Sequence, residues 1–348
     1  MKKIILVVDD SRLNLVIARD LLSEEYDVQT VDSGEGAFQF LEEKEPDLVL
    51  LDIQMPKMDG FEVMRRLQGH KAWRKIPVIF LTADRTEKTE ETCFQMGAMD
   101  YIGKPFVPAI MMQRVRRTLE LQGYRKSLEQ MVEQQLQRIT QLQQDIIITM
   151  ANLIESRDGT TGEHVKRTSA YVELLVGKMQ EKGIYREILT PRYIDYLKKA
   201  SPLHDIGKIT VPDRILQKPG ALTQEEYDLI KLHAKAGSRL ISENMDRIVD
   251  KEFVEIARDL AAYHHEKWNG GGYPGNLKGE QIPLAARILA IADVFDALVS
   301  ERQYKKGMTL EQAFGIMEKE RGNSFEPVLL DTFLESGEEL RQLMEELS

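Results

Sequence analysis

The sequence predicts a multidomain chain in which an α/β part is followed by an all-α part, with a long heptad-repeat helix between them. Its 348 residues are more than the roughly 150 of a typical single domain. Short apolar runs alternate with amphipathic stretches only up to about residue 120, and helical periodicity dominates after residue 153. We therefore expect three segments, residues 1–120, 121–153 and 154–348.

Charge and composition limit the partners and the compartment. The chain has 47 basic and 57 acidic side chains and a net charge of −10, which repels phosphate backbones and excludes a nucleic acid polymer as the main partner. The single cysteine, Cys93, cannot form an internal disulfide. No apolar stretch suits a signal peptide or a membrane span, so we expect a cytoplasmic protein with no membrane partner.

Polar side chains follow the apolar runs of the first segment, which we interpret as the five strands of a parallel sheet. Asp9 and Asp10 follow the first run, and Asp52, Thr82 and Lys104 follow later ones. Ligands of open α/β sheets bind at the carboxyl ends of the strands, so these groups are expected to converge. The runs are Ile4–Val8, Val28–Val31, Leu48–Leu51, Val78–Leu81 and Tyr101–Ile102.

The converging carboxylates predict a cation site that handles phosphate. Three carboxylates close together need a cation, and an oxygen-only site that keeps waters suits Mg²⁺. Asp52 is a candidate nucleophile, because carboxylates form aspartyl-phosphates. Lys104 and Thr82 are suited to contact the phosphoryl oxygens. Each residue alone is an ordinary strand-end residue, so only the combination indicates a site.

The motifs "VVDDS", "LLDIQMPKMDGFE", "IFLTAD" and "DYIGKPF" resemble the receiver domain of two-component response regulators, over about residues 1–120. The resemblance implies a doubly wound (βα)5 fold in which Asp52 accepts phosphate from a histidine kinase. It implies that Mg²⁺ is held by Asp10, Asp52 and the backbone carbonyl of Gln54, with Asp9 assisting. It also implies that Thr82 and Tyr101 form a switch pair and that the Lys104–Pro105 peptide is cis.

Apolar residues of the second segment recur at alternating steps of three and four. We expect a parallel dimeric coiled coil, because the apolar stripe is narrow and the other faces are charged or carry amides. The alternative is a single helix that packs on its own domains. The stripe comprises Leu121, Leu128, Val132, Ile139, Leu142, Ile146 and Leu153.

Histidines are concentrated in the third segment, where helices are expected around Val172–Met179, Tyr193–Ala200, Tyr227–Leu240, Phe253–His265 and Ile288–Val299. Five of the six histidines lie there, and only His70 lies elsewhere. Together with two aspartates they predict a site for Fe, Mn, Zn or Ni. Seven ligands exceed the needs of one metal, so we expect two metals bridged by Asp205, an arrangement that cleaves phosphodiesters. The candidate ligands are His164, His204, Asp205, His233, His264, His265 and Asp293.

A lysine accompanies the central pair of these ligands. Lys208 follows His204 by four residues and Asp205 by three, so on a helix the three share one face. An ammonium group there is suited to meet the charge of a substrate phosphate.

The motifs "HDIGK", "HHEKWNGGGYP" and "ILAIADVFDAL" resemble the HD-GYP family of cyclic di-GMP phosphodiesterases. The resemblance implies hydrolysis to pGpG, with GMP as the alternative end product, and favours Fe or Mn, with Ni and Zn as alternatives. It assigns His164, His204, Asp205 and Asp293 to one metal, and Asp205, His233, His264 and His265 to the other. It places Lys208, Arg287 and Lys305 at the substrate phosphates. The signature loop Gly272, Tyr273 and Pro274 would contact guanine or a partner diguanylate cyclase domain.

Three positions depart from that family pattern. Thr160 stands where members with a third metal have glutamate, so we expect two metals. Asn269 and Glu326 stand where aspartate is usual. These departures support an alternative function, a catalytically weak module that binds cyclic di-GMP or a cyclase domain.

Overall fold

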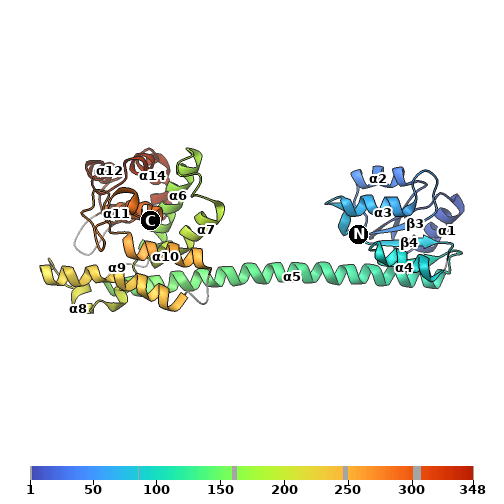
Figure 1. The fold of residues 1–348 in the computed structure, drawn as a ribbon, viewed down its shortest axis with the longest axis horizontal. Helices are drawn as coiled ribbons and strands as arrows, with labels where there is room; N and C mark the ends of the chain where they lie inside the picture. Colours follow the sequence, from blue (N-terminus) through green and yellow to red (C-terminus); the bar gives the residue numbers. More distant parts are fainter. Residues whose placement is uncertain (1, 85, 159–162, 246–249, 301–306, 348) are drawn as a thin grey trace. The chain divides into compact units, whose positions relative to one another are not determined.

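The computed structural model describes residues 2–84, 86–158, 163–245, 250–300 and 307–347. The chain forms two compact units, Met1–Gln137 and Arg138–Ser348, and we describe each by itself (Figure 1). Helix α5, Pro108–Glu155, begins in the first unit and ends in the second. The predicted order of an α/β part, a long helix and an all-α part along the chain is confirmed.

The first unit contains a five-stranded parallel sheet with strand order β2-β1-β3-β4-β5. The order reverses between β1 and β3, and open α/β sheets bind ligands at such a switch point. Asp9 directly follows β1, and Asp52 is the last residue of β3. The strands are β1 (Ile4–Val8), β2 (Asp27–Val31), β3 (Leu48–Asp52), β4 (Val78–Thr82) and β5 (Asp100–Gly103).

Successive strand residues point to opposite faces of this sheet and build two cores. Ile5 and Leu50 belong to the core that α5 and α1 cover, whereas Leu6 and Leu51 belong to the core under α2, α3 and α4. Helices cover both faces, which explains why the strands read as continuous apolar runs. The helices are α1 (Arg12–Leu22), α2 (Gly34–Glu43), α3 (Gly60–Gly69), η1 (Trp73–Lys75) and α4 (Glu87–Gln95).

The described part of the second unit consists of helices and turns, apart from one isolated bridge between Arg321 and Phe325. Its α-helices are α6 (Glu163–Glu181), α7 (Pro191–Ala200), α8 (Asp213–Leu216), α9 (Gln224–Met245), α10 (Lys251–Tyr263), α11 (Leu284–Val299), α12 (Leu310–Lys319), α13 (Pro327–Leu334) and α14 (Gly337–Glu346). Its 3₁₀ helices are η2 (Ser156–Asp158), η3 (Ser201–Leu203), η4 (Ile206–Thr210) and η5 (Gly279–Gln281).

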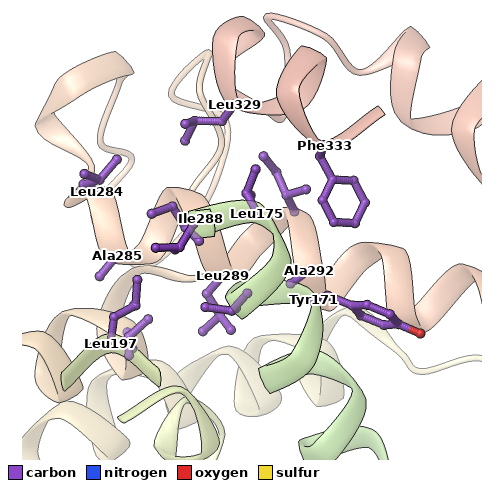
Figure 2. Close-up of a cluster of buried hydrophobic side chains, with 14 of the residues drawn as sticks. Tyr171, Leu175, Leu197, Leu284, Ala285, Ile288, Leu289, Ala292, Leu329 and Phe333 are labelled. Carbon is purple, nitrogen blue, oxygen red and sulfur yellow. The ribbon is translucent and has the colours of Figure 1, made fainter. Parts of the chain in front are cut away.

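Helix α11 forms the centre of the second unit, because it is apolar on nearly all sides and buried from Leu284 to Ala292. Figure 2 shows its residues Ile288 and Leu289 among side chains of α6 and α13, with Leu175 and Leu329 close by. The same helix carries Asp293 one residue after this buried stretch. A densely packed helix therefore fixes one candidate metal ligand.

Two sequence predictions for this unit are wrong. The "HDIGK" segment is not an α-helix but passes through the short 3₁₀ helices η3 and η4, because Pro202, Gly207 and Pro212 disfavour a continuous α-helix there. Helix α10 ends at Tyr263 rather than at His265, and His264 caps it. The predicted helices around residues 172 and 288 are longer than expected at their N-terminal ends.

The two ends of α5 pack in different cores, and its heptad stripe lies between them. Met111 and Val115 belong to a core of the first unit, and Ala151 and Ile154 are buried in the second. Among the described residues the stripe remains exposed, as Val132, at 58 % exposure, illustrates. Within the described ranges, no helix combines the length and the apolar character that a membrane span requires.

Candidate functional site

The acidic pocket of the first unit lies at the carboxyl ends of β1 and β3. Asp9, Asp10 and Asp52 have carboxylate oxygens within 4.8 Å of one another. The ammonium group of Lys104 lies 2.7 Å from Asp9 Oδ2 and 2.8 Å from Asp52 Oδ1. Burial raises the pKa of Asp52, although its hydrogen bond from Lys104 opposes this. An oxygen-only cluster with one cationic neighbour fits a hydrated Mg²⁺ ion.

The other residues predicted for the receiver site differ in burial and in local contacts. Thr82 is buried, and its hydroxyl group donates to the carbonyl oxygen of Asp84 at 2.9 Å. The ring of Tyr101 is half-buried beneath the guanidinium of Arg114. Gln54 is exposed two residues after Asp52. The Lys104–Pro105 peptide is cis, as predicted.

The histidines and aspartates of the second unit come together from five different segments. One group comprises His164 of α6, His204 after η3 and Asp293 of α11. The other comprises Asp205, His233 of α9, and His264 and His265 after α10. Within each group the ligand atoms lie within 4.8 Å of one another. The structure thus brings together all seven residues that the sequence analysis singled out as ligands.

Main-chain carbonyls fix the orientation of three imidazole rings. The Nδ1 atoms of His204, His233 and His264 lie 2.7 to 2.8 Å from the carbonyl oxygens of Ser201, Ile230 and Leu260. A hydrogen bond there directs the other nitrogen, Nε2, toward the centre of the site.

Within the part of the chain that the structure describes, those inward-facing nitrogens have no hydrogen bond of good geometry, although they are buried. The same is true of Asp205 Oδ1. Buried polar atoms without partners are costly and rare in folded proteins. Four such atoms in one cluster fit ligands for metal ions, whereas hydrogen bonding alone would leave them unexplained. The atoms concerned are Nε2 of His204, His233 and His264 and Oδ1 of Asp205.

Asp205 lies between the two groups, with one oxygen facing each. Its Oδ1 is 3.1 Å from His233 Nε2 and 3.5 Å from His264 Nε2. Its Oδ2 is 3.5 Å from His204 Nε2. Burial would raise the pKa of Asp205, but Lys208 and His204 outweigh it and hold the pKa well below its usual value. An ionised carboxylate that faces both groups is suited to bridge two cations.

The neutral state of two imidazoles also suits metal binding. Burial lowers the pKa of His204 to about 4. Burial and the neighbouring His264 hold the pKa of His265 well below its usual value. Metals bind the neutral form of imidazole, so these rings need not lose a proton at neutral pH.

His164 is oriented by a side chain, which the sequence analysis did not identify. Its Nδ1 lies 2.7 Å from Asp296 Oδ2, and Asp296 also accepts hydrogen bonds from Arg167 at 2.6 and 3.0 Å. Burial opposes a charged imidazole, but Asp296 and Asp293 outweigh it and raise the pKa of His164 to about 9. The i, i+3 spacing of Asp293 and Asp296 on one helix was the sequence signal available for this role.

Lys208 lies beside the bridging carboxylate. Its Nζ is 2.7 Å from Asp205 Oδ2 and 3.1 Å from Glu155 Oε1. In a 3₁₀ helix residues three apart lie above one another, so Asp205 and Lys208 meet although the segment is not an α-helix. The sequence analysis missed Glu155, which is 53 residues away along the chain.

Arg287, predicted to face substrate phosphates, is buried in an ion pair. Its Nη1 donates to Glu326 Oε2 at 2.6 Å and to the hydroxyl oxygen of Tyr185 at 2.9 Å. The guanidinium also lies over the ring of Trp268. These contacts give Arg287 a structural role and explain how Glu326 is accommodated. Lys305 and Thr160 lie outside the described residues.

The signature loop lies against the second histidine group. The ring of Tyr273 is 4.8 Å from the ring of His265, and the Tyr273–Pro274 peptide is cis. A Cβ atom on Gly272 would lie 2.3 Å from the backbone nitrogen of Lys267, so only glycine fits. Asn269 accepts a hydrogen bond from the backbone nitrogen of Gly271 at 2.7 Å.

Two family models match the chain. The response regulator receiver domain matches residues 5–116, and the HD domain matches residues 126–329. These matches cover both units.

Named relatives match over most of the chain. "Probable cyclic di-GMP phosphodiesterase" of Vibrio cholerae serotype O1 is 39 % identical over 339 residues, which cover 95 % of this chain and 77 % of that protein. "Cyclic di-GMP phosphodiesterase response regulator RpfG" of Xanthomonas campestris pv. campestris is 33 % identical and covers 99 % of this chain and 90 % of that protein. "3'3'-cGAMP-specific phosphodiesterase 2" of Vibrio cholerae is 40 % identical over 195 residues, 56 % of this chain and 35 % of that protein. The chain therefore belongs to the HD-domain family, within the group of response regulators that join a receiver domain to an HD domain.

Proposed function

We propose that this response regulator hydrolyses cyclic di-GMP to pGpG in its HD domain, with GMP as the alternative end product, and that phosphorylation of Asp52 controls the reaction. The observation that carries the proposal is the pair of ligand groups that share Asp205, with four buried polar atoms left for cations. The names of the relatives that match over most of the chain support the choice of substrate.

Two divalent cations fit the site. His164, His204, Asp293 and Asp205 would hold one, and Asp205, His233, His264 and His265 the other. Bound cations supply an activated water as the nucleophile and stabilise negative charge on the phosphate oxygens. We propose Fe or Mn, with Ni and Zn as alternatives, since these metals accept mixed imidazole and carboxylate ligands.

The chain's own residues bind and orient the substrate. Lys208 contributes a positive charge beside Asp205 and neutralises a phosphate of the dinucleotide. Tyr273, half-buried against His265, provides an aromatic face for a guanine base. A protein of net charge −10 thus attracts an anionic substrate through a local group of cations.

The receiver supplies the regulatory input. A histidine kinase donates the phosphoryl group to Asp52. Mg²⁺ would be held by Asp10 and Asp52, with Asp9 assisting, and by the backbone carbonyl of Gln54, and it would stabilise negative charge on the phosphoryl oxygens. Lys104, already 2.8 Å from Asp52, is placed to contact a phosphoryl oxygen.

We also propose that the heptad stripe of α5 pairs with a second copy of the chain as a parallel coiled coil. Val132, Ile139 and Ile146 recur every seven residues and alternate with Leu128 and Leu142. β-Branched residues at one core position and leucine at the other favour parallel two-stranded coiled coils. These side chains are more than half exposed in the single chain.

Light scattering after size exclusion tests the dimer. The double variant Val132→Asp and Ile139→Asp is expected to be monomeric, because charge at the seam repels a partner helix. The control Gln134→Asp and Gln141→Asp changes exposed residues outside the stripe and is expected to remain dimeric. A dimeric seam variant would contradict the proposal.

Direct assay tests the activity. Purified full-length protein is incubated with cyclic di-GMP and Mn²⁺, or with Fe²⁺ under anaerobic conditions, alongside Asp205→Ala. We expect pGpG to form with wild type and no product with the variant, together with about two metals per wild-type chain. No cleavage with either metal would favour the binding-module alternative, and preferential cleavage of 3'3'-cGAMP would overturn the substrate.

A further inference from the structure

The last residue of helix α5 reaches the metal site. Glu155 is only 2 % exposed, and its Oε1 accepts a hydrogen bond from Lys208 Nζ at 3.1 Å. The same ammonium group lies 2.7 Å from Asp205 Oδ2. Lys208 is therefore held between a carboxylate of the metal site and a carboxylate of the helix that continues from the receiver.

A second contact ties the end of α5 to the same segment. The guanidinium of Arg157 donates to the carbonyl oxygens of Lys208 at 3.2 Å and Val211 at 3.1 Å, and lies 2.7 Å from Asp213 Oδ1. Lys208 lies within η4, Val211 follows η4 directly, and Asp213 is the first residue of α8. Both the backbone of η4 and the Lys208 side chain are thus bound to the residues at the end of α5.

Segment η4 in turn packs directly on α9. A Cβ atom on Gly207 would lie 1.9 Å from the carbonyl oxygen of His233, so the two backbones are in close contact at this point. A displacement of η4 would therefore push on α9, the helix that carries the candidate ligand His233. The chain of contacts runs from Glu155 through Lys208 and Asp205 to His233.

We infer that Glu155 is a positioning residue for the phosphodiesterase reaction: it holds the Lys208 ammonium against Asp205 and transmits the position of the α5 end to the metal site. This inference rests on the proposed function and deepens it. Glu155 acts through Lys208, whose ammonium group its carboxylate contacts.

The expected effect follows from the burial of the contact. The side chains of Glu155 and Lys208 are 3 % and 18 % exposed, so solvent screens their attraction weakly. Replacing a residue that orients a ligand of a metal site typically lowers activity by about tenfold or more. Glu155→Gln keeps the shape but removes the charge, so we expect kcat to fall about tenfold with metal content unchanged.

The experiment compares full-length wild type, Glu155→Gln and Glu181→Gln with and without beryllofluoride, which mimics phosphorylation. Glu181 is the matched control, because it is an exposed glutamate whose ion pair with Lys178 lies on the surface. We expect beryllofluoride to change the kcat of wild type and of the control but not that of Glu155→Gln. Glu155→Asp, which keeps the charge, is expected to recover part of the response.

A double-mutant cycle with Lys208→Met tests whether Glu155 acts through the lysine. In the Lys208→Met background, Glu155→Gln is expected to have no further effect on kcat. Additive effects of the two substitutions would overturn the inference, as would a Glu155→Gln enzyme with the kcat and beryllofluoride response of the control. Loss of metal from Glu155→Gln would also overturn it, because that indicates a structural role.

Binding measurements separate this inference from the proposed function. If wild type cleaves cyclic di-GMP and Glu155→Gln behaves identically, only the inference fails. If wild type does not cleave it, the proposed function fails, and calorimetric affinity for cyclic di-GMP decides the inference. Weaker binding by Glu155→Gln than by Glu181→Gln would then support it, and equal binding would overturn it.

Discussion

Gly207→Ala is the substitution for which the structure predicts the clearest effect. A Cβ atom at this position would lie 1.9 Å from the carbonyl oxygen of His233 and 2.5 Å from the backbone nitrogen of Gly237. Ordinary contacts begin near 3.4 Å, so η4 and α9 would have to separate by about 1.5 Å (3.4 − 1.9). The obstructing atoms are backbone atoms of a long helix, which cannot rotate away.

The separation affects both stability and metal binding. Overpacking a well-packed interior typically costs about 1–3 kcal/mol, and contact with backbone places this case at about 3 kcal/mol. For a unit of this size, each kcal/mol lowers the melting temperature by about 2–4 °C, so we expect a decrease of about 6–12 °C. Sites of this kind tolerate displacements of about 0.5 Å, so the pairing of Asp205 with His233 should fail and metal should be lost.

Differential scanning calorimetry and metal analysis measure these two effects. Gly177→Ala in α6 is the matched control, because a Cβ atom at Gly177 would meet no neighbouring atom within 4 Å. Alanine is preferred to glycine within a helix by about 0.5–1 kcal/mol, so the control should melt slightly higher and keep its metals. If Gly207→Ala melts like wild type and retains two metals, the close packing of η4 on α9 is refuted.

Three further substitutions test the charge arrangements. Burial raises the pKa of Asp52 above its unfolded value, so its stability contribution is present at low pH and is lost as pH rises through the folded pKa. Without Mg²⁺, Asp52→Asn should therefore gain stability relative to wild type as pH rises above about 4, measured by urea unfolding. Asp296→Asn removes the charge that orients His164, so metal affinity or activity should fall by about 10- to 100-fold. Metal titration measures the affinity, and unchanged affinity and activity would contradict this role of Asp296. Arg287→Met leaves Glu326 buried without its cation and should destabilise the HD domain by about 3–5 kcal/mol. The double variant Arg287→Met and Glu326→Met should recover stability. A loss of activity without a loss of stability would instead support a substrate contact of Arg287.

The sequence was informative wherever a signal was local. Buried strands of a parallel sheet are continuous apolar runs, so Leu48 to Leu51 predicted β3 to within one residue. The ligands could be selected because five of the six histidines lie in the third segment. Segment η4 was predicted incorrectly, because an i, i+3 spacing fits both α and 3₁₀ helices. The nearby prolines are the local signal that disfavours a continuous α-helix there.

Contacts between distant parts of the chain could not be predicted in the same way. Arg287 was expected at the substrate because the family resemblance implies that role, but its partner Glu326 lies 39 residues later. The Glu155–Lys208 contact joins residues 53 apart. No periodicity links such pairs, and only the packed structure shows which charges neutralise one another.

The two halves of the metal site are oriented by different means, and this bears on regulation. His204, His233 and His264 are oriented by main-chain carbonyls of their own segments, so their positions follow the backbone of η3, α9 and α10. His164 depends instead on the side chain of Asp296, which the densely packed helix α11 holds. The end of α5 contacts Lys208, which lies beside the carboxylate that faces both halves. A small displacement of α5 is therefore expected to act on the bridging position, where it affects both metals at once.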